Sequence, residues 1–161
     1  AILLPDMIMQ AEKGCLAEMV ALYEKTGGNV ISVEECDPEE THKYGIVGKG
    51  DAVGNGFRIT GMVEKPKPED APSNFSISGR YILQPEIFHL LETQERGAGG
   101  EIQLTDAMAR LMTEQSFTAV EYEGVTHDCG DKIGLLRANV ALALKREDLG
   151  AAAREAISAL L

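Results

Sequence analysis

Residues 61–66 read Gly-Met-Val-Glu-Lys-Pro, a short apolar run that ends in an adjacent acid and base. Proline cannot donate to a strand ladder, so Pro66 is expected to stop a strand at Glu64 and Lys65. Strand alternation sends these two side chains to opposite faces unless the backbone kinks there. At such a strand end a carboxylate can accept hydrogen bonds from sugar hydroxyls, and an ammonium can meet a phosphate. A solvated strand end is the alternative interpretation.

Two aspartates elsewhere in the chain have the chemistry of metal ligands. Asp6 follows an apolar run at 1–4, and ligands of open α/β sheets gather at the carboxyl ends of strands. Asp128 is expected at a strand-to-helix junction. Together the two carboxylates can clamp one Mg²⁺, which takes few protein ligands and leaves room for phosphate oxygens. The alternatives are a turn role for Asp6 and a helix N-cap role for Asp128.

Glycines and a polar segment provide weaker signals. Gly45 and Gly79 can let the backbone approach a ligand closely, although turns and bulges need glycine equally often. The segment 101–106 has a site-like composition, but Thr105 and Asp106 can also face solvent on a helix. The three cysteines are odd in number and lack metal-type spacing, which indicates reduced thiols and a cytoplasmic protein.

Composition limits the possible partners. The 161 residues carry a net charge of −11, which argues against binding to a nucleic-acid backbone. A phosphate-bearing substrate would therefore need a divalent ion or a few placed cations. No apolar run approaches the roughly 20 residues that cross a bilayer, so no membrane association is expected.

The elements that must position these residues alternate in type. Residues 1–4 predict a strand buried on both faces of a parallel sheet, because the run is continuously apolar. A helix at 15–26 and a strand at 29–35 then predict a βαβ crossover. Further strands are expected at 44–48, up to 64–65, at 75–83 and at 117–122, and helices at 85–93, 103–114, 131–147 and 150–160. We expect an α/β fold forming a single domain over residues 1–161.

Seven short segments, in order through most of the chain, together resemble bacterial UTP–glucose-1-phosphate uridylyltransferases, or UDP-glucose pyrophosphorylases. The segments are L-L-P-D at 3–6, H-K-Y-G-I-V at 42–47, M-V-E-K-P at 62–66, A-P-S-N at 71–74, G-R-Y-I-L at 79–83, G-A-G-G-E-I-Q-L-T-D at 97–106 and H-D-C-G at 127–130. Each is weak alone, and their common order makes the pattern specific. The glucose-1-phosphate thymidylyltransferases share this scaffold and are the main rival.

The resemblance implies a Rossmann-like nucleotide-diphospho-sugar transferase fold, with a mixed sheet flanked by helices. It implies that the phosphate of glucose 1-phosphate attacks the α-phosphorus of UTP, giving UDP-glucose and pyrophosphate. In-line chemistry of this kind asks the protein mainly for positioning and charge neutralisation. The resemblance also suggests a homo-oligomer.

The same resemblance assigns roles to individual residues. Asp6 and Asp128 look like the Mg²⁺ ligands, and Asp6 and Lys65 like the catalytic groups. Glu64 looks like the acceptor for glucose hydroxyls and Lys65 like the cation that meets the sugar phosphate. The wall of the sugar pocket is implied for Gly45, Gly79 and Tyr81.

One departure from the family pattern is large. The family begins with a Gly-rich loop, G-x-G-T-R followed by a lysine, that cradles the nucleoside triphosphate, and these 161 residues contain no such segment. We therefore expect the N-terminal part of the enzyme to be missing. Asp131 is a smaller departure, because an amide residue is common there. A non-catalytic sugar-phosphate-binding or oligomerisation module is the alternative from another class.

Overall fold

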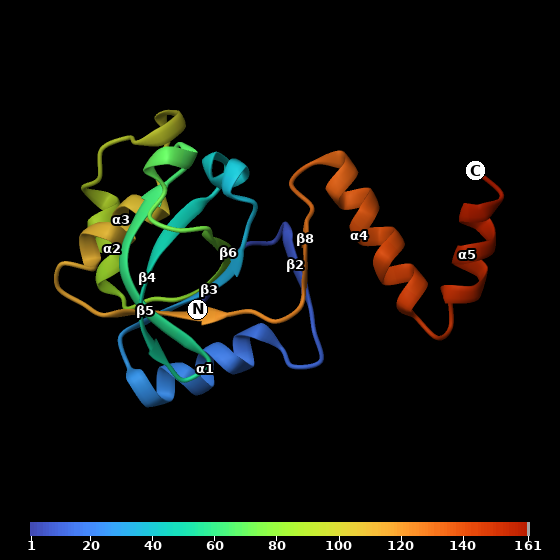
Figure 1. Ribbon diagram of the computed structural model, residues 1–161, viewed down its shortest axis with the longest axis horizontal. Coiled ribbons are helices and arrows are strands. Elements are labelled where there is room, and N and C mark those ends of the chain that lie inside the picture. The colour runs from blue at the N-terminus through green and yellow to red at the C-terminus, as the bar shows by residue number, and fades with distance from the viewer. Residues whose placement is uncertain (161) are drawn as a thin grey trace. The chain divides into compact units, whose positions relative to one another are not determined.

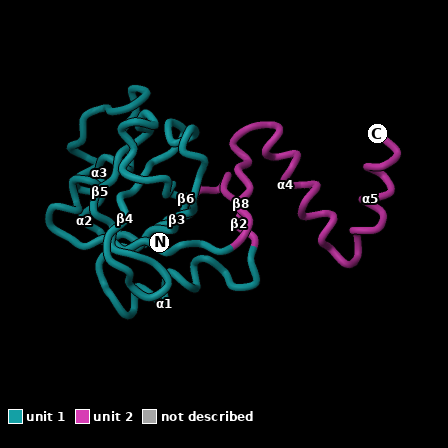
Figure 2. The backbone as a smooth tube through the Cα atoms, in the orientation of Figure 1, with its two compact units in different colours: residues 1–3, 11–123 teal, residues 4–10, 124–161 magenta. Residues whose placement is uncertain are grey.

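The computed structural model describes residues 1–160, and backbone contacts divide the chain into two compact units (Figure 2). Unit 1 consists of residues 1–3 and 11–123, and unit 2 of residues 4–10 and 124 onward. The expectation of a single domain stays a prediction. Among the described residues, no helix is long and apolar enough to cross a membrane.

Unit 1 is built on a six-stranded mixed sheet with the order β1-β6-β3-β7-β5-β4. Its strands are β1 (Ile2–Leu3), β3 (Asn29–Glu35), β4 (Gly45–Val53), β5 (Gly56–Glu64), β6 (Phe75–Ile82) and β7 (Phe117–Glu121). β3 and β7 pair in parallel, and the other pairs are antiparallel. Because β4 also pairs with β6, the start of β4 lies beside the start of β6, with Ile46 opposite Ser76 and Val47 opposite Phe75. The expected mixed α/β sheet is confirmed.

Helices cover both faces of this sheet (Figure 1). Cys15 of α1 (Cys15–Thr26) contacts Ser32 of β3. Ile31 and Val33 alternate with Ser32 and join the core formed with α2 (Glu86–Glu92) and α3 (Leu104–Leu111). Side chains alternate along a strand, so α1 lies on the opposite face from α2 and α3. Short 3₁₀ turns occur at Pro38–Lys43, Pro68–Asp70 and Ala98–Gly100.

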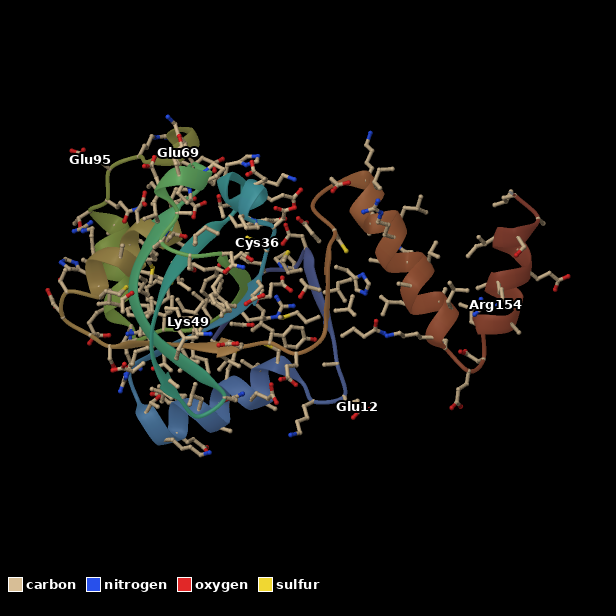
Figure 3. The ribbon with its side chains drawn as sticks, in the orientation of Figure 1. Glu12, Cys36, Lys49, Glu69, Glu95 and Arg154 are labelled. Atoms are coloured by element: carbon tan, nitrogen blue, oxygen red, sulfur yellow. The ribbon has the colours of Figure 1, made fainter. Side chains whose placement is uncertain are left out.

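The core of unit 1 is aromatic and aliphatic. The rings of Phe57 and Phe75 meet edge to face, with centroids 5.0 Å apart. Lys49, labelled in Figure 3, places its ammonium 4.4 Å from the centre of the Phe75 ring and 2.8 Å from Glu121 Oε1. Fully burying a phenylalanine contributes roughly 1.5–3 kcal/mol. These contacts hold β4 and β5 in place. The candidate site lies at the end of this strand pair where Gly45 is opposite Glu64.

Unit 2 contains a two-stranded antiparallel sheet and two helices. β2 (Met7–Gln10) pairs with β8 (Val125–Asp128), so that Met7 lies opposite Asp128. The helices are α4 (Lys132–Lys145) and α5 (Gly150–Ser158). The sequence predicted both helices and a strand-to-helix junction at Asp128, where β8 ends, but gave no bounds for β8 and did not predict β2.

The expectation for residues 1–4 was wrong. β1 is an edge strand with the single neighbour β6, to which it runs antiparallel, and Leu3 is 49% exposed. β1 and β3 both flank β6, so they are parallel to each other without being neighbours. An apolar run cannot distinguish a central strand from an edge strand, because covering the run depends on segments distant in sequence.

Candidate functional site

The backbone kinks where β5 ends. Lys65 has a φ of +49°, and among residues 1–160 it is the only non-glycine residue with a positive φ. Its N–H donates to Tyr44 O at 2.9 Å, which holds the kinked residue against the chain entering β4. The kink brings Lys65 Nζ to 3.7 Å from Glu64 Oε1 instead of sending the side chains apart. The acid and the base therefore lie together. Strand alternation would have separated them, and the kink is the exception that the sequence analysis named.

The two side chains differ in exposure. Only 11% of the Glu64 side chain is exposed, against 44% of the Lys65 side chain. A mostly buried carboxylate is stabilised by a nearby cation, and the ammonium keeps access to solvent and to an incoming anion. This geometry suits a bound molecule with hydroxyls on one side and a phosphate on the other.

Gly45, the first residue of β4, lies directly opposite Glu64 in the sheet register. A Cβ placed on Gly45 would lie 3.0 Å from Glu64 Oε2, 2.8 Å from Thr105 Oγ1 and 3.0 Å from Ile77 Cδ1. Side-chain atoms of Glu64, Thr105 and Ile77 therefore lie so close to the Gly45 backbone that a side chain at position 45 would clash with them. Close approach is the reason for glycine at this position.

Thr105 is another polar residue near Gly45. The sequence did not decide whether it belongs to a site or faces solvent. It lies in the first turn of α3 and is 94% buried, so it does not face solvent. A signal existed in the sequence, because Thr105 shares the helix face of the apolar residue Met108, three positions later. Asp106, its neighbour, instead places Oδ2 beside Gly97.

Gly79 and Tyr81 lie further along β6. Ile31 pairs with Tyr81 and Val33 with Ile77, so three β6 residues stand opposite the single residue Ser32. Gly79 occupies this bulge with φ of +73°, a conformation that favours glycine. Tyr81 is buried in the core of unit 1. A bulge role for Gly79 is thus established, and roles for both residues in sugar binding stay predictions.

In unit 2, Asp6 and Asp128 face a common point. A Cβ placed on Gly130 would lie 3.0 Å from Asp128 Oδ1 and 3.5 Å from Asp6 Oδ2. The Cys129 N–H donates to Asp6 O at 2.7 Å, and the Gly130 N–H donates to Asp128 Oδ1 at 2.8 Å. Both aspartates are exposed. The segment after β8 therefore holds the two carboxylates near each other.

Asp131, not Asp128, is the N-cap of α4. Its Oδ1 accepts from Ile133 N at 2.7 Å and from Gly134 N at 2.9 Å. The same backbone N–H groups, chiefly that of Gly134, hold the pKa of Asp131 below its ordinary value. The capping alternative for Asp128 is therefore wrong, and the side chain of Asp128 is left for another role.

The carboxylate pair has the donor set for a magnesium ion. Within residues 1–160 there is no group of three or more His, Cys, Asp or Glu residues arranged to hold a metal. Mg²⁺ needs no such group, because it binds through one or two carboxylates and completes its shell with water and phosphate oxygens. Two carboxylates facing one point beside a glycine fit this pattern.

Comparison with protein families and relatives gives one consistent picture. The family model for nucleotidyl transferases matches residues 1–145. A UTP–glucose-1-phosphate uridylyltransferase of Komagataeibacter xylinus is 48% identical over 133 residues, covering 83% of this chain and 47% of that protein. The enzyme of the same name from Staphylococcus epidermidis is 42% identical over 149 residues, covering 92% of this chain and 52% of that protein. The chain thus spans about half the length of these curated relatives.

Solved structures agree with the sequence relatives. UDP-glucose pyrophosphorylase complexed with UDP-glucose matches with a TM-score of 0.84 and 36% identity, over 89% of this chain and 55% of that one. UTP-bound UGPase from Acinetobacter baumannii matches with a TM-score of 0.83 and 34% identity, over 99% of this chain and 55% of that one. The resemblance seen in the seven sequence segments is confirmed.

Proposed function

We propose a function from one premise: the chain belongs to the nucleotidyl transferase family, whose model spans residues 1–145. The protein that carries this chain transfers a uridylyl group from UTP to glucose 1-phosphate, forming UDP-glucose and releasing pyrophosphate. Relatives 42–48% identical bear the name of that activity. Solved relatives have been captured with UTP or with UDP-glucose.

The observation that carries the proposal is the kinked strand end. Glu64 and Lys65 meet at 3.7 Å, and the second oxygen of Glu64 lies against the backbone of Gly45. In this proposal the carboxylate accepts hydrogen bonds from glucose hydroxyls. The ammonium meets the 1-phosphate and neutralises part of its charge while it attacks UTP. Gly79 and Tyr81 form a further part of the pocket wall.

Asp6 and Asp128 are proposed to hold Mg²⁺. When bound, the ion would neutralise phosphate charge, which a chain with a net charge of −11 cannot do without help. The two carboxylates would be the protein ligands of the ion, and Asp6 is in this sense part of the catalytic machinery. Their exposure leaves the remaining coordination positions to water and phosphate oxygens.

We further propose a homo-oligomer in the cytoplasm. α4 presents the large apolar residues Ile133, Leu135 and Leu136 at 58%, 49% and 58% exposure. Apolar side chains exposed together on one helix are typical of a contact surface. Sedimentation of the purified protein tests the oligomer, and a monomer at micromolar concentration would contradict it.

The function is tested by product identification. The full-length protein, given glucose 1-phosphate, Mg²⁺ and either UTP or dTTP, is expected to form UDP-glucose faster than dTDP-glucose. Chromatography of the sugar nucleotides measures both. A preference for dTTP would favour the thymidylyltransferase alternative, and binding of glucose 1-phosphate without any product would favour a non-catalytic module.

A further inference from the structure

A chain of three buried polar side chains reaches the bulge of β6 from the far side of the sheet. Cys15 Sγ donates to Ser32 Oγ at 3.2 Å, and Ser32 Oγ lies 2.8 Å from Ser78 Oγ. The residues belong to α1, β3 and β6, and their exposures are 6%, 0% and 1%. A hydroxyl can accept one hydrogen bond and donate another, so these groups satisfy each other in the interior.

This chain ends inside the bulge itself. Ser78 immediately precedes Gly79, and Ser32 is the one β3 residue opposite the three bulged residues 78–80. Ser32 is therefore placed to fix the extra length of β6 against β3. The network has no part in the chemistry proposed for Glu64 and Lys65.

Gly79 needs such support because glycine has no Cβ, so its backbone is freer to change conformation than that of any other residue. Its φ of +73° lies in the region that only glycine enters freely. Two neighbours hold it: Ser78 through the hydroxyl of Ser32, and Arg80 through a bond from Nη1 to Gly79 O at 3.0 Å. The position of the Gly79 peptide is thus set by the side chains of Ser32, Ser78 and Arg80.

We propose that Ser32 and Cys15 are positioning residues for glucose 1-phosphate, acting through Ser78 on the Gly79 bulge. None of the three touches the sugar; they fix the backbone that does. The proposal rests on the proposed function, in which Gly79 lines the sugar pocket. Gly79 follows Ile77 by two residues on β6, and Ile77 Cδ1 lies 3.0 Å from the position that a Cβ on Gly45 would take.

The thiol can act as the first donor of the chain. Burial raises the pKa of Cys15 above its ordinary value, so at neutral pH the sulfur carries its proton. With Cys15 donating to Ser32, the Ser32 hydroxyl is free to donate to Ser78. A serine at position 15 would keep this direction of donation, and an alanine would remove it.

The test compares buried serines of two paired strands, Ser32 of β3 with Ser76 and Ser78 of β6. Ser32→Ala and Ser78→Ala each break the chain, whereas the control Ser76→Ala removes a buried hydroxyl outside the bulge, one that donates to Glu34 O at 3.1 Å. In the full-length protein we expect KM for glucose 1-phosphate to rise about five- to tenfold in the first two variants. The turnover number and KM for UTP should stay within about twofold, and Ser76→Ala should leave all three constants unchanged.

Cys15 provides a second pair of variants if a serine variant fails to fold. Cys15→Ser should match the wild type, and Cys15→Ala should raise KM for glucose 1-phosphate by a smaller factor than Ser32→Ala. Amide hydrogen exchange at residues 78–81 should be faster in Ser32→Ala than in Ser76→Ala.

The outcomes separate the two proposals. Equal KM values in Ser32→Ala, Ser78→Ala and Ser76→Ala, in a protein whose wild type uses glucose 1-phosphate, would overturn the positioning role alone. A wild type that does not bind glucose 1-phosphate would overturn the proposed function. In that case unchanged exchange at residues 78–81 in Ser32→Ala would overturn the bulge support as well.

Discussion

Glu64 and Asp128 are both carboxylates on the last residue of a strand, and the fold treats them differently. Glu64 ends β5 with its side chain 11% exposed, beside Lys65 and opposite Gly45. Asp128 ends β8 exposed, and its neighbouring carboxylate is that of Asp6. The first carboxylate has its counter-charge supplied by the chain, and the second must obtain one from solution.

This difference separates stability from activity. Removing the partner of a buried carboxylate leaves an uncompensated charge in the interior, so changing the surroundings of Glu64 alters both stability and binding. Two exposed carboxylates that face one point repel each other unless a cation joins them. Substitutions of Asp6 or Asp128 should therefore impair turnover with little cost to the fold, and those around Glu64 should affect both.

The largest effect is expected for Asp128→Asn. The amide keeps an oxygen that can accept from Gly130 N but loses the charge that would hold Mg²⁺. Pyrophosphate release should fall about a thousandfold, since metal stabilisation of phosphate charge is worth several kcal/mol. The free energy of unfolding should stay within about 0.5 kcal/mol of the wild type. Near-normal turnover at saturating Mg²⁺ would remove Asp128 from the metal site.

Two substitutions of Lys65 should distinguish the effect of losing its ammonium from the effect of its strained backbone conformation. Lys65→Ala and Lys65→Gly both lose the charge, and each should reduce kcat/KM for glucose 1-phosphate about a hundredfold. Only glycine accepts φ of +49° without strain, so Lys65→Gly should be about 1 kcal/mol more stable than Lys65→Ala. Urea unfolding of the two variants measures the difference. Equal stabilities would show that the kink relaxes when the side chain is removed.

A smaller loss is expected for Gly45→Ala. The new methyl group would crowd Thr105, Glu64 and Ile77, so KM for glucose 1-phosphate should rise about tenfold. Overpacking should cost about 1–3 kcal/mol. Gly61→Ala on the neighbouring strand β5 is the matched control, because a Cβ there meets nothing within 4 Å. If both variants behave alike, close approach is not the reason for glycine at position 45.

The smallest effect on turnover is expected for Asp131→Ala, which removes the α4 cap. The folded-state pKa of Asp131 lies below its ordinary value of 3.8, so the capping contribution is fully present above that value. It is lost as the pH falls through the folded-state pKa. Asp131→Ala should therefore be less stable than the wild type near neutral pH, and the two should converge in acid. Urea melts across this range, with turnover nearly unchanged at neutral pH, provide the check.

Local periodicity predicted the helices and strands whose pattern can be read within one continuous segment of the sequence. Residues 15–26 and 29–35 were assigned as the structure has them, because helical spacing ends at two glycines and a β-branched run follows. β2 was not predicted, and β8 was indicated only by the junction expected at Asp128, because each strand has only four residues and their pairing joins distant parts of the chain. The edge position of β1 escaped for the same reason.

The site was predicted in composition but not in geometry. The sequence indicated that Glu64 and Lys65 are adjacent to a strand end, yet nothing in a lysine forces a positive φ. The hydrogen bond from Lys65 N to Tyr44 O holds that conformation, and it depends on how β4 and β5 pair. The burial of Thr105 was left open, although its spacing from Met108 indicated the buried face of the helix.

Pyrophosphate release by the full-length protein with UTP, glucose 1-phosphate and Mg²⁺ tests the central claim most directly, with Asp6→Ala and Glu64→Ala measured beside the wild type. Nucleotidyl transfer predicts release that requires all three components. It also predicts that each variant, shown to be folded, loses most of this release. A wild type that releases no pyrophosphate, or an Asp6→Ala variant with normal release, would contradict the account.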